Sequence, residues 1–376
     1  MGNSISGEFG AATVGQEVVD KFADKCSKTI IVTGANTGLG FETARCLASR
    51  GATVVLACRN SKLGEAAVDK IKSAIPNASV SFIPLDLGSL KSVKDFAYLF
   101  QEKFKRLDVL INNAAVMACP KSVTLDGIET QFGVNHLGHF YLVQLLLPTL
   151  IKSGAPSSPA RVVNVSSMGQ YLFGPEEGVR FDDINGDEYY NSWERYGQSK
   201  LCNVLFSKEL NNRFKSKNVI SVSLHPGVIT GTELLRHVFT LTNIKNVSKD
   251  GLLGAWSILS PQKLACLSSQ RSKTIPEGVS TTLVAALDPD IVPGGYYYDC
   301  KLSQGEGLHP AVHEVELAIK LWEFSESIIS KLSKETARKV IKVQIAKPQE
   351  SWMKLIFIML LGLFAAFVGF ELLNKL

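Results

Sequence analysis

Residues 29–40 read TIIVTGANTGLG, and this stretch decides the fold. Its first half is an apolar, β-branched run, which is typical of a strand buried on both faces of a parallel sheet. Its second half, TGANTGLG, opens a helical pattern that runs to about Arg50. Gly34 permits a tight turn, and Gly38 and Gly40 let the backbone approach a pyrophosphate at the positive end of that helix. The stretch therefore predicts a dinucleotide site at a strand-to-helix turn.

The same alternation of an apolar run and a helical pattern continues along the chain. A seventh candidate strand follows a helix that begins near Pro276. This order predicts a doubly wound α/β Rossmann fold with a seven-stranded parallel sheet and ligands beyond the carboxyl ends of the strands. The further predicted strands cover residues 52–59, 79–87, 108–114, 160–167, 219–227 and 294–300.

The composition excludes several classes of protein. The 376 residues are 45% hydrophobic and 20% charged, which is enough for one large core. The net charge of +5 is spread along the chain without a dense basic stripe, so a nucleic-acid partner is not expected. The seven cysteines form no Cys-x-x-Cys pair, which argues against a disulfide framework or a metal site and favours a reducing compartment. The sequon at Asn164 falls inside a predicted strand and is interpreted as a chance match.

Cofactor preference is indicated by the end of the second predicted strand. NAD sites usually place a carboxylate there, but this chain has Cys58 followed by Arg59. A guanidinium can bind a 2′-phosphate in bidentate fashion, so Arg59 favours NADP(H); the alternative is an ordinary surface arginine. Asp86, after the third strand, could accept from the adenine amino group. The run NNAA at 112–115 ends the fourth strand, where Asn side chains can tie neighbouring strands together.

Six stretches carry a resemblance to a known family: TGANTGLG, NNAA, FGVNHLGHF around Asn135, VNVSS, YGQSK and HPG. In order and spacing they resemble the short-chain dehydrogenase/reductase family over residues 28–300. The retinol dehydrogenase and WW-domain oxidoreductase branch is the most similar, through FDDIN at 181–185, YGQSKLCNVLFSKEL at 196–210 and LWEFSESI at 321–328. The chain departs from that branch in having no WW domain and an additional C-terminal tail.

The resemblance implies a catalytic set and a cofactor set. Tyr196 would exchange a proton with the substrate oxygen, Ser167 would hydrogen-bond that oxygen, Lys200 would hold the nicotinamide ribose, and Asn135 would support a water that links Lys200 to solvent. The segment after HPG would cover the nicotinamide, with Thr232 as its hydroxyl residue. The implied cofactor residues are Gly34, Asn36, Gly38, Leu39, Gly40, Arg59, Asp86, Leu87, Asn113, Tyr196, Lys200 and Thr232.

Tyr196 and Lys200 also make chemical sense on their own. Side chains four apart on a helix lie on one face, and an ammonium near a phenol lowers the phenol pKa from about 10. A helical setting therefore predicts an acid/base tyrosine. Tyr297 and Lys301 have the same spacing, but they follow PGG in a strand-like stretch, where the side chains would point to one face yet lie far apart.

Three histidines are interpreted as structural rather than catalytic or metal-binding. His225 closes a predicted strand, which is a common place for a packed histidine. His136 and His139 lie one turn apart on the predicted Asn135 helix, without carboxylate or cysteine neighbours in the sequence. No metal is expected.

Both ends of the chain point to a membrane. Residues 352–373 are almost entirely apolar and long enough to span a bilayer, which predicts a tail anchor; a buried core helix is the alternative. The basic segment 331–351 predicts a catalytic domain that faces the cytosol, on the endoplasmic reticulum or another organelle. The N-terminal MGNSIS fits an N-myristoylation signal at Gly2, although such short matches also arise by chance. The expected organisation is an N-terminal segment 1–27, a Rossmann domain 28–330, a linker 331–351 and the anchor.

The sequence leaves three functions open. The first is a membrane-anchored NADP(H)-dependent enzyme that interconverts a lipophilic alcohol and its aldehyde or ketone, with a retinoid, sterol or fatty aldehyde as the substrate class. Apolar runs between 233 and 275 suit a cover over such a substrate, or helices that pack on the core. The others are a protochlorophyllide-type double-bond reductase and a non-enzymatic dinucleotide-binding scaffold. Helices near 127–152 and 193–216 resemble faces that pair in homodimers of the family.

Overall fold

The computed structural model describes residues 8–229, 234 and 259–334. The chain divides into two compact units, Met1–Ser325 and Glu326–Leu376, and the sheet with its flanking helices lies in the first. Among the described residues, no helix is both long enough and apolar enough to span a bilayer. The predicted anchor at 352–373, most of the basic linker, Thr232 and Gly2 lie outside the described residues.

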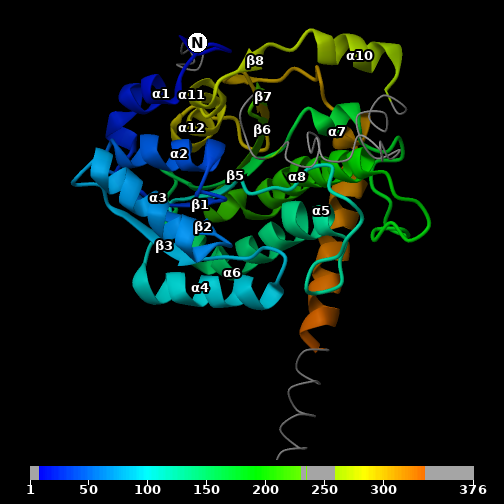
Figure 1. Ribbon diagram of the computed structural model, residues 1–376, viewed down its shortest axis with the longest axis horizontal. Helices are drawn as coiled ribbons and strands as arrows, with labels where there is room; N and C mark the ends of the chain where they lie inside the picture. Colours follow the sequence, from blue (N-terminus) through cyan, green and yellow to red (C-terminus); the bar gives the residue numbers. More distant parts are fainter. Residues whose placement is uncertain (1–7, 230–233, 235–258, 335–376) are drawn as a thin grey trace, which may run out of the picture. The chain divides into compact units, whose positions relative to one another are not determined.

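An eight-stranded sheet forms the centre of the first unit, with the order β10-β9-β6-β5-β4-β1-β2-β3 (Figure 1). Neighbouring strands are parallel except β9 and β10, which are antiparallel. The strands are β1 (Thr29–Thr33), β2 (Thr53–Cys58), β3 (Val80–Pro84), β4 (Val109–Asn112), β5 (Ala160–Val165), β6 (Val219–His225), β9 (Tyr296–Tyr298) and β10 (Lys301–Leu302). A separate small sheet pairs β7 (Val228–Ile229) with β8 (Ser272–Lys273).

Helices cover both faces of the sheet, as the alternating pattern predicts (Figure 1). One face packs against α2 (Gly38–Ala48), α3 (Ser61–Ala74) and α12 (Ser280–Leu287), and the other against α4 (Leu90–Lys103), α6 (Gly138–Ser153) and α8 (Ser192–Phe214). A further helix covers residues 315–334. The short helical elements are α1 (Gly15–Lys21), η2 (Ala23–Lys25), α5 (Thr130–Phe132), η3 (Gly133–Leu137), α7 (Gly169–Leu172), η4 (Lys215–Lys217), α10 (Pro261–Ser268), α11 (Ile275–Gly278) and η7 (Pro310–His313).

The prediction of a seven-stranded sheet is wrong, because the sheet has eight strands. The seventh strand, β9, ends at Tyr298, and the chain turns through Asp299 and Cys300, whose φ angles are +48° and +64°. It then returns as β10, so Lys301 pairs with Tyr298 across an antiparallel hairpin. The prediction that Tyr297 and Lys301 share one strand is therefore wrong as well. The hairpin was missed because its turn contains neither glycine nor proline.

The N-terminal segment packs into the core of the first unit. Val18 and Val19 of α1 are fully buried in the cluster that also contains α2 and α12. A Cβ on Gly15 would lie only 2.4 Å from a methyl of Val279, which shows how closely α1 approaches the start of α12.

A buried polar ladder connects three central strands. Asn112 of β4 donates to the Asn164 side-chain carbonyl at 2.8 Å, and the Asn164 amide donates to the Ser221 hydroxyl of β6 at 3.1 Å. Ser221 and Ser207 of α8 share a further hydrogen bond of 2.8 Å. Asn164 is 2% exposed, which agrees with the interpretation of its sequon as a chance match.

Replacing Asn164 with leucine should destabilise the fold. The substitution leaves the buried Asn112 amide without its Asn164 partner, which costs about 1–3 kcal/mol of unfolding free energy, while Ser221 keeps its bonds to Val162 and Ser207. Urea unfolding of the full chain measures the difference. Ser81→Ala is the matched control, because the buried Ser81 hydroxyl has no hydrogen-bond partner among the described residues. Equal midpoints for the two variants would contradict the role of the ladder.

Candidate active site

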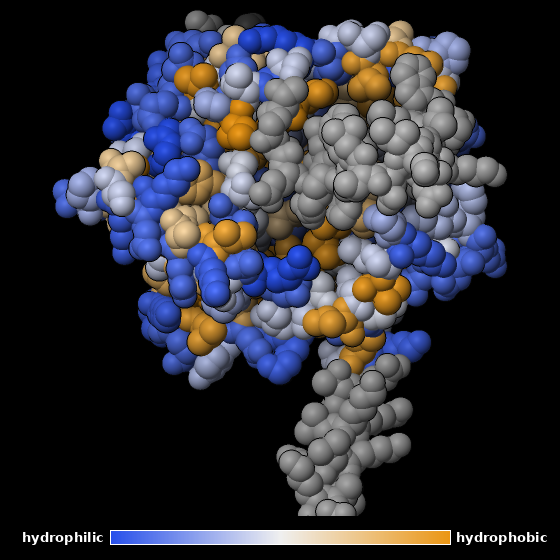
Figure 2. Space-filling model, viewed as in Figure 1, coloured by the Kyte–Doolittle hydropathy of each residue, from blue (hydrophilic) through white to orange (hydrophobic). Residues whose placement is uncertain are grey.

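A cavity of about 830 Å³ opens at the carboxyl ends of the central strands. Hydrophobic side chains are visible in a hollow on the face shown in Figure 2. The cavity wall contains the predicted cofactor and catalytic residues with two exceptions: Asn135, which lies behind the wall, and Thr232, which is outside the described residues. The predicted residues in the wall are Gly34, Asn36, Gly38, Leu39, Gly40, Arg59, Asp86, Leu87, Asn113, Ser167, Tyr196 and Lys200.

The glycine-rich turn has the backbone geometry that a phosphate site requires. Gly34 and Gly38 have φ angles of +66° and +56°, in the region that side chains disfavour. A Cβ on Gly40 would lie 2.4 Å from the Gly34 carbonyl oxygen and 2.6 Å from the Asn113 amide nitrogen. The N-cap of α2, Thr37, makes no side-chain cap hydrogen bond, so first-turn amide groups are available to an anion. These residues fit the pyrophosphate of a nicotinamide dinucleotide.

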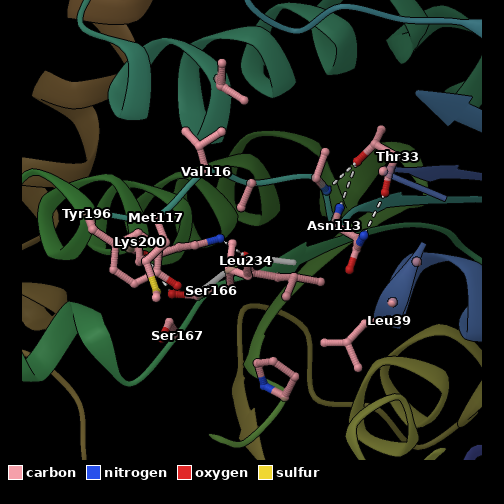
Figure 3. A pocket seen from close by; sticks show the side chains of 18 of the residues that line it. Thr33, Leu39, Asn113, Val116, Met117, Ser166, Ser167, Tyr196, Lys200 and Leu234 are labelled. Carbon is pink, nitrogen blue, oxygen red and sulfur yellow. Dashed lines mark hydrogen bonds between the residues drawn. The ribbon is translucent and has the colours of Figure 1, made fainter. Parts of the chain in front are cut away.

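Asn113 ties the end of β4 to the end of β1, as Figure 3 shows. Its side-chain amide donates to the Thr33 carbonyl oxygen at 2.8 Å, and its backbone N–H donates to the Thr33 hydroxyl at 2.9 Å. The expectation that the NNAA asparagines tie adjacent strands is confirmed. Asn113 therefore holds the floor of the cavity beside the glycine-rich turn.

Arg59 and Asn60 line the end of the cavity beside α3. The Asn60 side chain caps α3 by accepting from the Leu63 amide at 3.1 Å. Asp86, which accepts from the Gly88 amide at 2.9 Å, is the one acidic side chain in the described part of the wall. A dinucleotide bound along this wall would meet a cation and no carboxylate at the end of β2.

Tyr196, Ser167 and Lys200 lie together at the other end of the cavity (Figure 3). Tyr196 and Lys200 come from successive turns of α8, and Ser167 follows the end of β5. The Lys200 ammonium donates to the Val165 carbonyl oxygen at 2.9 Å and lies 5.8 Å from the centre of the Tyr196 ring. The neighbouring Ser166, which also lines the cavity, uses its hydroxyl to donate to the Lys200 backbone oxygen at 2.7 Å.

Burial dominates the protonation of this pair. It raises the pKa of Tyr196 to about 12, against the opposing effect of the Ser167 hydrogen bond. It also lowers the pKa of Lys200 to about 7. The expected lowering of the phenol pKa is not found in this structure, because loss of water around the phenol outweighs the Ser167 hydrogen bond. Tyr196 is poised as a proton donor at neutral pH.

Asn135 connects the catalytic helix to the cavity wall from behind. It lies in the π-helix η3, where its amide group donates to the Val116 carbonyl oxygen and to the Ser199 hydroxyl, both at 2.9 Å. Its side-chain oxygen accepts from the Val116 amide at 2.8 Å. Asn135 thus fixes a wall residue and the neighbour of Lys200 at the same time.

The wall around Tyr196 is apolar, which sequence analysis did not specify residue by residue. Met117, Met168, Phe173 and Trp193 pack together with Tyr196 in one buried cluster. The Phe173 and Trp193 rings lie 4.9 Å apart. Their signal in the sequence is weak, because single apolar residues in loops have no periodicity. Further apolar wall residues missed by sequence analysis are Val116, Leu172, Val228 and Ile229, whereas Leu234, Leu259 and Leu267 come from the apolar runs that were expected to suit a substrate cover.

The three histidines are buried, and His225 also lines the cavity. His136 shares a hydrogen bond of 2.9 Å with the Ser325 hydroxyl, and His139 shares one of 2.9 Å with the Thr33 hydroxyl. Burial lowers the pKa of His225 to about 3, so its imidazole is neutral. Within the described residues, no group of His, Cys, Asp and Glu side chains is arranged to hold a metal ion.

The whole heptad ERYGQSK at 194–200 takes part in building this end of the site. Arg195, 1% exposed, donates to the Asp183 carboxylate at 2.7 Å and to the Asp183 backbone oxygen at 2.6 Å. Gln198 accepts from the Arg180 amide at 2.8 Å. A Cβ on Gly197 would lie 2.5 Å from backbone atoms of Phe173 and Gly174. The heptad therefore carries the acid/base pair and also anchors the segment between Ser167 and Trp193.

The fold and the site together are those of an oxidoreductase that uses a nicotinamide dinucleotide. Comparison with known proteins agrees: residues 28–176 match the family model described as short chain dehydrogenase. Retinol dehydrogenase 12 of Bos taurus is 42% identical over 300 residues, which cover 79% of this chain and 85% of that protein. Short-chain dehydrogenase TIC 32 B, chloroplastic, of Brassica napus is 37% identical over 329 residues, covering 86% and 95%.

A solved structure supports the same assignment. An uncharacterised protein from Mycobacterium paratuberculosis is 33% identical, with a TM-score of 0.58 over 80% of this chain and 92% of that one. The chain belongs to the short-chain dehydrogenase/reductase family and is retinol dehydrogenase-like. It is an oxidoreductase that acts on CH–OH groups.

Replacing Gly197 with alanine should impair turnover more than cofactor binding. The new methyl group would push α7 and Phe173 away from α8, and a shift of about 1 Å at a catalytic centre can reduce turnover about 100-fold. The cofactor turn at Gly34–Gly40 is on other elements, so dinucleotide affinity should change little. Steady-state kinetics and dinucleotide titration measure the two effects. Gly10→Ala is the control, since no atom lies within 4 Å of a Cβ built there; wild-type turnover in Gly197→Ala would refute the packing argument.

Proposed function

We propose that the chain is an NADP(H)-dependent enzyme that interconverts a lipophilic alcohol and its aldehyde or ketone. The observation that carries this proposal is the apolar cluster of Met117, Met168, Phe173 and Trp193 around Tyr196. Such a wall makes dispersion contacts and few hydrogen bonds with a substrate, which suits a lipophilic carbonyl compound. The retinol dehydrogenases among the relatives support a retinoid within this class; sterols and fatty aldehydes are the other candidates.

Each residue of the site has its own role in the proposed reaction. The bound dinucleotide would supply the hydride. Tyr196, protonated at neutral pH because burial raises its pKa to about 12, donates a proton to the carbonyl oxygen in the direction of reduction. Ser167 orients that oxygen, and the Lys200 ammonium stabilises the phenolate that remains. Asn135 holds the turn of α8 that carries Lys200 in position through its hydrogen bond to the neighbouring Ser199.

A panel of retinals, ketosteroids and fatty aldehydes should reveal turnover by the full chain in detergent micelles. NADPH oxidation is the measurement, with Tyr196→Phe as the comparison. The phenylalanine variant keeps the ring but loses the proton, so turnover should fall at least about 100-fold while NADPH still binds. Equal rates in both proteins would end the assignment of Tyr196. Binding of NADPH without turnover of any compound would instead favour the scaffold.

NADP preference rests on Arg59 in the cavity wall at the end of β2. A charge-assisted contact to phosphate contributes about 1.5–3 kcal/mol, so Arg59→Ala should raise the Michaelis constant for NADPH about 10- to 100-fold. The constant for NADH should not change, because NADH lacks the 2′-phosphate. Lys72→Ala, an exposed cation near the other end of α3, serves as control. An unchanged NADPH constant in Arg59→Ala would disprove the contact.

We infer further that residues 352–373 anchor the enzyme in a membrane with the catalytic domain in the cytosol. The apolar run at 355–370, which carries no charge, and the basic segment 331–351 before it support this topology. A myristoyl group on Gly2 would add a second, weaker membrane contact. Resistance to carbonate extraction, combined with protease sensitivity of the catalytic domain on intact organelles, is the expected result. Release by carbonate would count against the anchor, and an unmodified N-terminal peptide in mass spectra would count against Gly2 myristoylation.

A further inference from the structure

The segment 259–273 forms part of the apolar end of the cavity. Leu259 and Leu267 line the cavity itself. Cys266, in the same turn of α10, lies 3.7 Å from the Met168 sulfur and packs against the cluster around Tyr196. The position of this segment therefore determines how much room a substrate finds beside Tyr196.

One side chain of the central sheet is hydrogen-bonded to this segment. The Tyr298 hydroxyl donates to the side-chain oxygen of Gln270 at 2.5 Å. The amide of Gln270 donates in turn to the Cys266 carbonyl oxygen at 3.2 Å, at the C-terminal end of α10. Gln270 thus connects Tyr298 directly to the helix that carries Cys266 and Leu267.

Tyr298 is itself rigidly held. It pairs with His225 across the parallel strands β6 and β9, and the two rings stack with centres 5.3 Å apart. The Lys273 ammonium lies 5.9 Å from the centre of the Tyr298 ring and forms an ion pair with Asp299. Lys273 is 1% exposed, so this pair is shielded from solvent on the lysine side.

The same cluster contacts the turn after β6. A Cβ on Gly227, whose φ is +104°, would lie 2.7 Å from the Lys273 side chain. His225, Pro226 and Gly227 also line the cavity at the catalytic end. The cluster around Tyr298 therefore joins the 259–273 segment and the catalytic turn to one fixed point on the sheet.

We propose that Tyr298 is a positioning residue that sets the size of the apolar substrate end through its hydrogen bond to Gln270. This inference rests on the proposed function, because it assumes that a lipophilic substrate occupies that end. Without the hydroxyl, the 259–273 segment keeps its apolar contacts, the short β7–β8 pairing and the Lys273–Asp299 ion pair, but Gln270 loses its hydrogen bond to Tyr298. Long substrates then bind in a wider and less complementary space, whereas the chemistry at Tyr196 is unaffected.

The kinetic test uses Tyr298→Phe in the full chain with aldehydes of increasing length. Loss of one buried hydrogen bond corresponds to about a five- to tenfold change. The Michaelis constant for the longest aldehydes should rise by that factor, with kcat and the NADPH constant unchanged. Tyr297→Phe is the matched control, since Tyr297 is its neighbour in β9 but belongs to the core cluster on the opposite face of the sheet. Parallel changes in both variants, or a fall in kcat alone, would overturn the proposal.

A second readout does not depend on activity. Six of the seven cysteines are buried and Cys266 is partly exposed, so its alkylation by a maleimide reports the position of the segment. Tyr298→Phe should accelerate this alkylation about fivefold, and Tyr297→Phe should not. Gln270→Leu removes the same bond from the other side, together with the bond from Gln270 to Cys266, so the double variant should match Gln270→Leu; a further effect of Tyr298→Phe in that background would refute the coupling. Unchanged labelling in Tyr298→Phe refutes the positioning role, whereas lack of carbonyl turnover by the wild type refutes only the proposed function.

Discussion

The close contact of α7 with α8 at Gly197 is the constraint on which the catalytic end depends. A side chain at this position would collide with the backbone at Phe173 and Gly174. Because only hydrogen occupies the space, the segment that follows Ser167 can lie directly on the helix that carries Tyr196. The proximity of the Ser167 hydroxyl to the phenol, and the apolar wall that Phe173 completes, both follow from this contact.

The same helix turn shows why a catalytic pair requires more than its spacing. Tyr297 and Lys301 share the four-residue interval, yet a hairpin turn separates them and the Tyr297 hydroxyl accepts from the Val292 amide. Tyr196 and Lys200 lie close together because the helix places them on successive turns, and the Val165 carbonyl oxygen fixes the Lys200 ammonium. Both are removed from water, so the phenol is protonated at neutral pH and the lysine can lose its charge near pH 7. A reductase needs the first property, and a bound anionic cofactor would favour the charged form of Lys200.

Much of the fold and part of the site follow from the sequence because their signals are local. β-Branched runs, the glycine-rich turn and the heptad 194–200 each determine a short stretch of structure on their own. The hairpin to β10 was missed because Asp299 and Cys300 adopt left-handed conformations in a turn that contains neither glycine nor proline. The contacts of Gln270 with Tyr298 and of Met168 with Cys266 join residues far apart in the chain. Such pairs produce no periodic pattern in the sequence. The pKa of Tyr196 likewise depends on burial by several segments, which spacing alone does not reveal.

Burial of α8 also bears on how copies of the chain could associate. Trp322, from the helix that begins at 315, is 4% exposed and packs with its ring 4.9 Å from Phe140 of α6 and 5.8 Å from Phe206 of α8. The Arg213 guanidinium lies 4.7 Å from the same ring. Residues 315–325 therefore cover the outer groove between α6 and α8, the helices expected to pair in a homodimer. The chain thus supplies from its own C-terminal helix the apolar cover that the catalytic helix requires.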